Sequence, residues 1–390
     1  MTHRKDRSDR LALPHLDGTQ DRVIPTLILI LLWSVTMFLV IARIRFDVAR
    51  GGGPWQTADW LVNYGSGVVR RGGIGEAILW LSDLLSINAL SFVYTLQLSM
   101  VFAVAGALLI AFFRVGRPAR LAILLMAPLG VIYWGVDPGT FGRKETLGYL
   151  AAVVLMIDRN APRAFFASAV IYAAAVIGHE VNVFFLPFLL LIGFLRTNDP
   201  DRPWIWTTIM ISIAFLGMVF ALMYVAVDDT GGMCAPLMAH TDSDIFCLGI
   251  IAWLDKGFAA NPETVGRLMD IAGPMDLAFA FALAAAPLLF AVAASKRKTW
   301  MILGCLAAFV VLAPVFYMAR DWGRWISMAV LGATFVIMTA ALWQPRRAKF
   351  LFAPVTTPQI ALATFAAIFL SFDHSQLVPF HGLSRIALAW

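Results

Sequence analysis

The chain has 390 residues, of which 60% are hydrophobic and 14% charged, with a formal net charge of +6 and a mean hydropathy of +0.79. A soluble protein would carry nearer a quarter charged residues, so the composition excludes a soluble globular enzyme and predicts an all-α polytopic membrane protein. The positive charge requires no nucleic-acid partner, because Lys and Arg gather in short loops as the positive-inside rule expects.

The amino-terminal segment 1–22 is polar and basic, and we expect it to be a cytoplasmic tail. The apolar run that follows is too long and uniform for a cleaved signal peptide, so it predicts a retained span over 23–43. We expect 23–372 to form a single transmembrane domain and 373–390 to form a periplasmic tail.

The stretch 59–76, which reads D-W-L-V-N-Y-G-S-G-V-V-R-R-G-G-I-G-E, combines acids, arginines and glycines directly after that span. Arg70 and Arg71 suit phosphate, because a guanidinium offers paired donors. The glycines would let backbone amides approach an anion, and Asp59 would serve as a base. The alternative is a structural turn at the lipid headgroups. Residues 74–85 have helical spacing of apolar side chains, which predicts an interfacial helix.

Further spans are predicted at 90–113, 121–135, 146–157, 204–226, 276–294, 299–317, 326–343 and 358–372. As a single helix, 164–195 would be about 48 Å long, which exceeds a hydrocarbon core of about 30 Å. Its two ends are both basic, so we expect a hairpin of two spans with His179 and Glu180 at the outer turn. The total is about 11 spans, with the carboxyl terminus outside and periplasmic loops at 44–89, 136–145, 227–275 and 318–325.

The long outer loop 227–275 contains Cys234 and Cys247, whose spacing favours a disulfide in an oxidising compartment over two unpaired cysteines. Cys305 lies in an apolar span and is expected to serve packing. The D-x-D sequence at 242–244 is more typical of a solvated turn, and E-x-x-H and H-x-x-E spacings are absent. We therefore assign no metal ligand and expect no cofactor, with a divalent metal kept as an alternative.

Polar clusters without an anchoring role all fall on the predicted outer face, which indicates a site there. The candidate catalytic residues are Asp59, Glu180 and Asp321. The candidate substrate-binding residues are Arg70, Arg71, Glu76, Asp137, Arg143, Lys144, Glu145, His179, Arg320, Trp322 and Arg324. Arginine, acid and tryptophan together suit a lipid-linked sugar phosphate better than an ion or a small metabolite.

The span plan, with Asp59 in the first outer loop, resembles the integral-membrane glycosyltransferases of the GT-C type. The sequences V-V-R-R-G-G-I-G-E and D-W-G-R-W also resemble motifs in bacterial membrane proteins of surface-polysaccharide synthesis, including O-antigen and capsule polymerases. The chain differs from the GT-C pattern in lacking a second acid beside Asp59.

This resemblance implies a multi-pass enzyme of the bacterial inner membrane. It would transfer a sugar or oligosaccharide from a polyprenyl-phosphate or -diphosphate carrier to a glycan acceptor at the periplasmic face. Monosaccharide transfer and polymerisation both remain open. The alternatives are a transporter or flippase of the same lipid-linked sugars and a non-catalytic assembly scaffold. The expected partners are the lipid-linked sugar, the glycan acceptor and membrane lipid.

Overall fold

The computed structural model describes residues 20–137, 139–196, 202–224, 226–241, 243–254, 274–296, 298–318 and 321–371. All elements assigned in these ranges are helical. Five helices are long and apolar enough to cross a membrane: α1 (Gln20–Ala49), α4 (Ala89–Arg114), α8 (Ala161–Gly178), α10 (Arg202–Met223) and α16 (Trp322–Trp343). The structure thus agrees with the helical, membrane-embedded class that the composition predicts.

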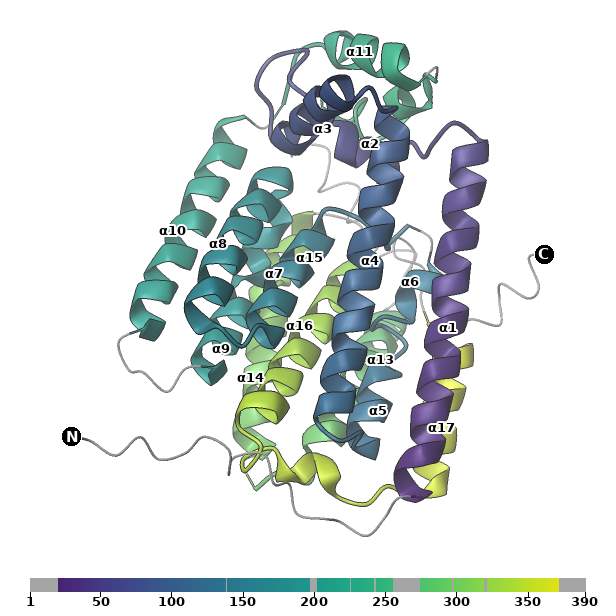
Figure 1. Cartoon of the computed structure of the whole chain (residues 1–390), viewed down its shortest axis with the longest axis vertical. Helices are drawn as coiled ribbons and strands as arrows, with labels where there is room; N and C mark the ends of the chain where they lie inside the picture. The colour runs from purple at the N-terminus through teal and green to yellow at the C-terminus, as the bar shows by residue number, and fades with distance from the viewer. Residues whose placement is uncertain are drawn as a thin grey trace.

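Shorter helices fill the spaces between and above these five. They are α2 (Gln56–Leu61), α3 (Gly72–Leu85), α5 (Ala119–Leu125), α6 (Tyr133–Val136), α7 (Glu145–Ile157), η2 (Glu180–Phe185), α9 (Leu186–Arg196), α11 (Gly231–Thr241), η3 (Ile245–Leu248), α13 (Pro274–Val292), α14 (Lys298–Val311), α15 (Ala313–Met318), η5 (Lys349–Phe352) and α17 (Thr357–Phe369). Figure 1 shows the long helices running side by side, with α2, α3 and α11 together at one end of the bundle. We call these three helices the cap.

The predicted span at 121–135 is not one helix. It consists of α5, a series of turns and the four-residue α6. The reason is local, because Pro128 and Gly130 interrupt the helical pattern. Irregular backbone at membrane depth is tolerated where protein surrounds it, and the side chains from Leu121 to Val136 are buried accordingly.

The segment 164–195 is two helices with a break between them, as its length and basic flanks predict. α8 ends at Gly178, His179 is extended, and the chain continues through η2 into α9. The far ends of α8 and α9 meet again, because a side chain at Gly193 would contact the ring of Phe165 at 3.5 Å. His179 and Glu180 therefore lie at the turn of a helical hairpin.

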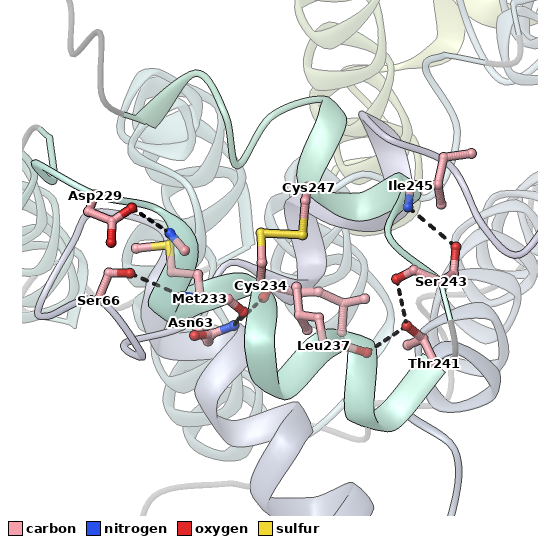
Figure 2. Close-up of a disulfide and its surroundings, with 12 residues drawn as sticks. Asn63, Ser66, Asp229, Met233, Cys234, Leu237, Thr241, Ser243, Ile245 and Cys247 are labelled. Carbon is pink, nitrogen blue, oxygen red and sulfur yellow. Dashed lines mark hydrogen bonds between the residues drawn. A yellow bond between two sulfur atoms is a disulfide. The ribbon is translucent and has the colours of Figure 1, made fainter.

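In the cap, α11 is joined to the segment between α2 and α3 by hydrogen bonds and to η3 by a disulfide. Figure 2 shows the bond between Cys234 on α11 and Cys247 on η3. Asn63 Nδ2 donates to the carbonyl of Met233 at 3.1 Å, and the Met233 amide donates to Ser66 Oγ at 3.0 Å. These contacts cover the loop that carries Arg70 and Arg71.

Candidate functional site

Asp59 lies on α2, a short helix that is fixed to the segment before α7. The side-chain Nε2 of Gln56 donates to the carbonyl of Phe141, and Trp60 Nε1 donates to the carbonyl of Gly142 at 2.7 Å. Gly142 has a φ of 61°, a left-handed conformation in which a side chain would also press on Gln97. The arrangement turns Asp59 into the protein, where it is 1% exposed.

Glu180, at the hairpin turn, is held by both arginines of the loop between α2 and α3. Arg70 Nη1 donates to Glu180 Oε1 at 2.5 Å, and Arg71 donates to the same carboxylate through Nε at 3.0 Å and Nη2 at 2.6 Å. A second carboxylate, Asp59, lies 3.7 Å from Arg71 Nη1. Two arginines that are far from the turn in sequence thus pair with the same buried acid.

Arg71 has an unusual backbone conformation, with a φ of 70° where α3 begins. A left-handed conformation is uncommon for a residue with a side chain, and it is held here by surrounding contacts. Lys144 Nζ supplies one of them by donating to the carbonyl of Arg71 at 2.9 Å. Such strain is frequent at functional sites.

The glycines at 72 and 75 lie close against the loop that precedes α3. A side chain at Gly72 would lie 2.4 Å from the ring of Tyr64, and one at Gly75 would lie 1.9 Å from the carbonyl oxygen of Val62. The Gly72 amide donates to the carbonyl of Val69 at 3.2 Å, so at this position the amide is not offered to an anion. The two glycines allow α3 to pack directly on the preceding loop.

Glu145 is the first residue of α7, and its carboxylate lies between Arg324 and His179. Its Oε1 is 3.5 Å from Arg324 Nη2 and 3.5 Å from His179 Nε2. Arg324, on the first turn of α16, also pairs with Asp321 at 2.7 Å and lies 4.2 Å over the ring of Trp325. Three elements, α7, α16 and the hairpin turn, therefore meet at Glu145.

These contacts define what we call the charged cluster. It comprises Asp59, Arg70, Arg71, Arg143, Lys144, Glu145, His179, Glu180, Asp321 and Arg324. Five of its members are basic and four are acidic, so with His179 neutral it carries one net positive charge. Such a concentration of charge in an apolar protein is costly and marks a functional site.

Burial and opposing charges set the protonation of the cluster. Burial would raise the pKa of Asp59, but Lys144, His179, Arg71 and Arg143 hold it below the usual value. Burial lowers the pKa of Lys144 to about 8, although Asp59 opposes that effect. Glu180 is the most strongly affected acid, because Arg71, His179 and Arg70 outweigh its burial and keep its pKa well below the usual range. Glu180 is thus a poor proton acceptor.

Several polar atoms of the cluster are buried without a hydrogen bond to any described residue. They are both carboxylate oxygens of Asp59, both of Glu145, and Nε and Nη1 of Arg324. Arg143 donates through Nε to the carbonyl of Gly139 at 2.5 Å, and no described residue accepts from its other two nitrogens. Unsatisfied buried groups are rare in proteins, so their convergence indicates a place where a ligand or water binds.

Three other predicted site residues make contacts outside the defined cluster. Glu76 is exposed on α3 and accepts from the amide of Tyr64 at 3.1 Å. Asp137 is buried and accepts from the amide of Gly139 at 2.9 Å. Trp322 is buried and donates to the carbonyl of Phe316 at 2.8 Å. Arg320 and the tail 373–390 lie outside the described residues.

Two polar residues near the cluster were missed in the sequence analysis. Asn182 Nδ2 donates to the carbonyl of Ala175 at 2.9 Å and also contacts those of His179 and Lys144, which ties the hairpin turn to the start of α7. Gln97, on α4, is fully buried against Gly142. A polar side chain inside an apolar run was the available signal for both.

Within the described ranges, no group of three or more His, Cys, Asp or Glu side chains is arranged to hold a metal ion. The cluster instead combines acids with arginines, a set suited to proton transfer beside an anion. No family model, curated protein or solved structure matches this chain.

Proposed function

We propose that the protein is a membrane glycosyltransferase that uses a polyprenyl-phosphate- or polyprenyl-diphosphate-linked sugar in glycan synthesis at the periplasmic face of the bacterial inner membrane. The observation that carries this proposal is that Asp59, whose carboxylate oxygens accept no hydrogen bond from a described residue, interacts electrostatically with Arg143 and Arg324, whose guanidinium groups keep donors that no described residue fills. The proposal includes the eleven-span, GT-C-like plan that the sequence suggests.

In this reaction, an acceptor hydroxyl attacks the anomeric carbon of the donor sugar while its proton passes to Asp59. The bond between that carbon and the carrier phosphate breaks, and the phosphate leaves with the bonding electron pair. Arg143 and Arg324 stabilise the charge that develops on it. Arg70 and Arg71, which we first expected to bind the phosphate, are engaged by Glu180 and act chiefly by holding the site together.

The positive surroundings of Asp59 favour its ionised form, which makes the free carboxylate a weak base. A bound phosphate would offset those surroundings, so it would raise the proton affinity of Asp59 when the donor is present. The base is thereby strengthened by the substrate whose reaction it assists.

The test uses purified protein in liposomes with a lipid-linked sugar and a range of acceptors, scoring carrier binding and product separately. Asp59→Asn should bind the carrier within about threefold of wild type and lose about 10²–10⁴-fold in turnover, because a base acts only on the way to the transition state. Asp83→Asn is the matched control, since Asp83 is an exposed acid on α3. Turnover retained in Asp59→Asn would reject Asp59 as the base.

A second candidate, a flippase of the same carriers, is favoured by one observation. The cluster lies where helices are interrupted, at the break between α8 and α9 and beside the irregular segment after α5. Interrupted helices with polar ends are typical of transporter binding sites. If wild-type protein moves the carrier across liposomes and never forms a glycosidic bond, the flippase replaces the transferase.

A further inference from the structure

The carboxylate of Glu145 has charged neighbours but accepts no hydrogen bond from a described residue. Both of its oxygens are buried and accept no hydrogen bond from a described residue, although Arg324 and His179 each lie 3.5 Å away. Arg324 in turn has two buried nitrogens, Nε and Nη1, that donate to no described residue. Asp321, at 2.7 Å, and Glu145, at 3.5 Å, therefore both pair with Nη2 of Arg324 and leave its Nε and Nη1 unfilled. Glu145 is the more distant of the two acids, and an anion with better geometry can replace it.

His179 is the titratable group placed to respond to that replacement. It is 1% exposed, and its ring lies between two carboxylates, with Nε2 toward Glu145 and Nδ1 at 3.5 Å from Glu180. The Val181 amide donates to Nδ1 at 3.3 Å. The neutral ring therefore carries its proton on Nε2, facing Glu145, and a second proton would be added at Nδ1, facing Glu180.

The charged groups around His179 come from every element packed at this point. They are Asp59 on α2, Arg70 and Arg71 before α3, Arg143, Lys144 and Glu145 at the start of α7, Glu180 on η2, and Asp321 and Arg324 at the start of α16. With His179 neutral they sum to one positive charge. A phosphate monoester carries up to two negative charges, so its entry would leave an uncompensated negative charge in a buried site.

We infer that an anion binding to Arg143 and Arg324 displaces Glu145 from Arg324 and draws one proton from solvent onto His179. The proton restores neutrality and gives Glu145 a full positive partner in place of the arginine it has lost. Glu145 thus acts as an internal competitor for the anion, and His179 is the residue that couples occupancy to pH. This inference rests on the anion site of the proposed function and concerns its regulation.

The first measurement is calorimetry of a short-chain prenyl monophosphate binding to the purified full chain in detergent. It is run near pH 7.5, where the probe is mostly a dianion, in buffers of different ionisation enthalpy. Wild type should take up about one proton per anion bound, and its affinity should tighten by up to tenfold for each pH unit lowered. Binding without proton uptake, or no binding at all, would overturn the inference.

Variants distinguish the specific roles of His179 and Glu145 from a general effect of mutation on the fold. His179→Gln should bind the anion with almost no proton uptake, whereas His240→Gln, on α11 at the cap, should match wild type. Glu145→Gln should bind the anion several-fold more tightly than wild type, because the competitor is gone, and a misfolded variant cannot give that result. Unchanged proton uptake in His179→Gln, or weaker binding in Glu145→Gln, would contradict the mechanism.

These outcomes are separable from those of the glycosyltransferase test. If the anion binds without proton uptake, the coupling to His179 is rejected and the glycosyltransferase proposal is unaffected. If wild-type protein takes up the proton on binding the anion and yet forms no product, the coupling is supported and the transferase proposal is rejected.

Discussion

Arginines at the two ends of the helical bundle have different partners. At the end opposite the cap, Arg120 and Arg196 donate to backbone carbonyls and lie on aromatic rings. Arg120 donates to the carbonyl of Phe290 at 2.7 Å and lies 4.6 Å over its ring. Arg196 donates to the carbonyls of Leu155 and Asp158 and lies 4.9 Å over Trp343. Beneath the cap, by contrast, Arg70, Arg71 and Arg324 pair with buried carboxylates.

The difference distinguishes arginines that stabilise the fold from arginines that can bind a ligand. Carbonyls at the ends of helices lack intrahelical donors, and an arginine that fills them stabilises the fold. A carboxylate paired to an arginine can be exchanged for a phosphate, and the cluster keeps unfilled atoms for such an exchange. Basic residues expected to serve only membrane orientation therefore also close the ends of helices.

The largest effect should come from Glu180→Gln. It leaves Arg70 and Arg71 without their main counter-charge, and breaking a buried pair costs about 3–5 kcal/mol. The free energy of unfolding in detergent measures the loss, with Asp158→Asn as the control because the Asp158–Arg163 pair is exposed. A loss for Glu180→Gln no greater than for the control would show that the cluster does not stabilise the fold.

Removal of the disulfide should have the second-largest effect on the stability of the protein. The bond joins residues separated by 13 positions, and closing a loop of that size is worth about 3 kcal/mol. Cys234→Ser with Cys247→Ser should increase hydrogen exchange in α11 and in the 63–66 loop that it contacts. Exchange raised only within α11 would mean that α11 does not order the 63–66 loop.

Arg196→Gln should destabilise the protein and leave the chemistry intact. Two carbonyls lose a charged donor, at about 1.5–3 kcal/mol for a hydrogen bond to a charged group. Turnover per folded molecule should equal that of wild type, since Arg196 lies at the end opposite the cap. A specific loss of turnover would contradict the division between the two ends.

Lys144 should make the cluster sensitive to alkaline pH. A lysine is charged below its pKa, which is about 8 here, so carrier binding should weaken as the pH rises through 8. Lys144→Gln should bind about tenfold less tightly at neutral pH and lose that dependence. Because the unfolded lysine keeps its proton to a higher pH, the free energy of unfolding should rise from pH 8 toward 10.5 in wild type alone.

Glu76→Gln should have the smallest effect. Glu76 is exposed and accepts one hydrogen bond from the amide of Tyr64, so the loss should stay below about 1 kcal/mol. Carrier affinity should not change. An effect on affinity comparable to that of Lys144→Gln would bring Glu76 into the site after all.

The sequence by itself determined the class of the protein and most of its helices. Apolar runs predict the long helices because a backbone in lipid must satisfy its own hydrogen bonds. The hairpin at His179 and Glu180 followed from length and flanking charge alone. Charged residues in apolar surroundings also pointed to most of the cluster, since their burial needs a reason.

Only the tertiary structure decided which charges pair and which stay open. Arg71 and Glu180 are 109 residues apart, and nothing local distinguishes Arg71 from Arg324 as a partner for that acid. The roles of Gly72 and Gly75 also depend on what packs against them, here Tyr64 and Val62. Propensity and hydropathy act over neighbouring residues, whereas ion pairing and close packing depend on contacts that exist only once the helices have assembled.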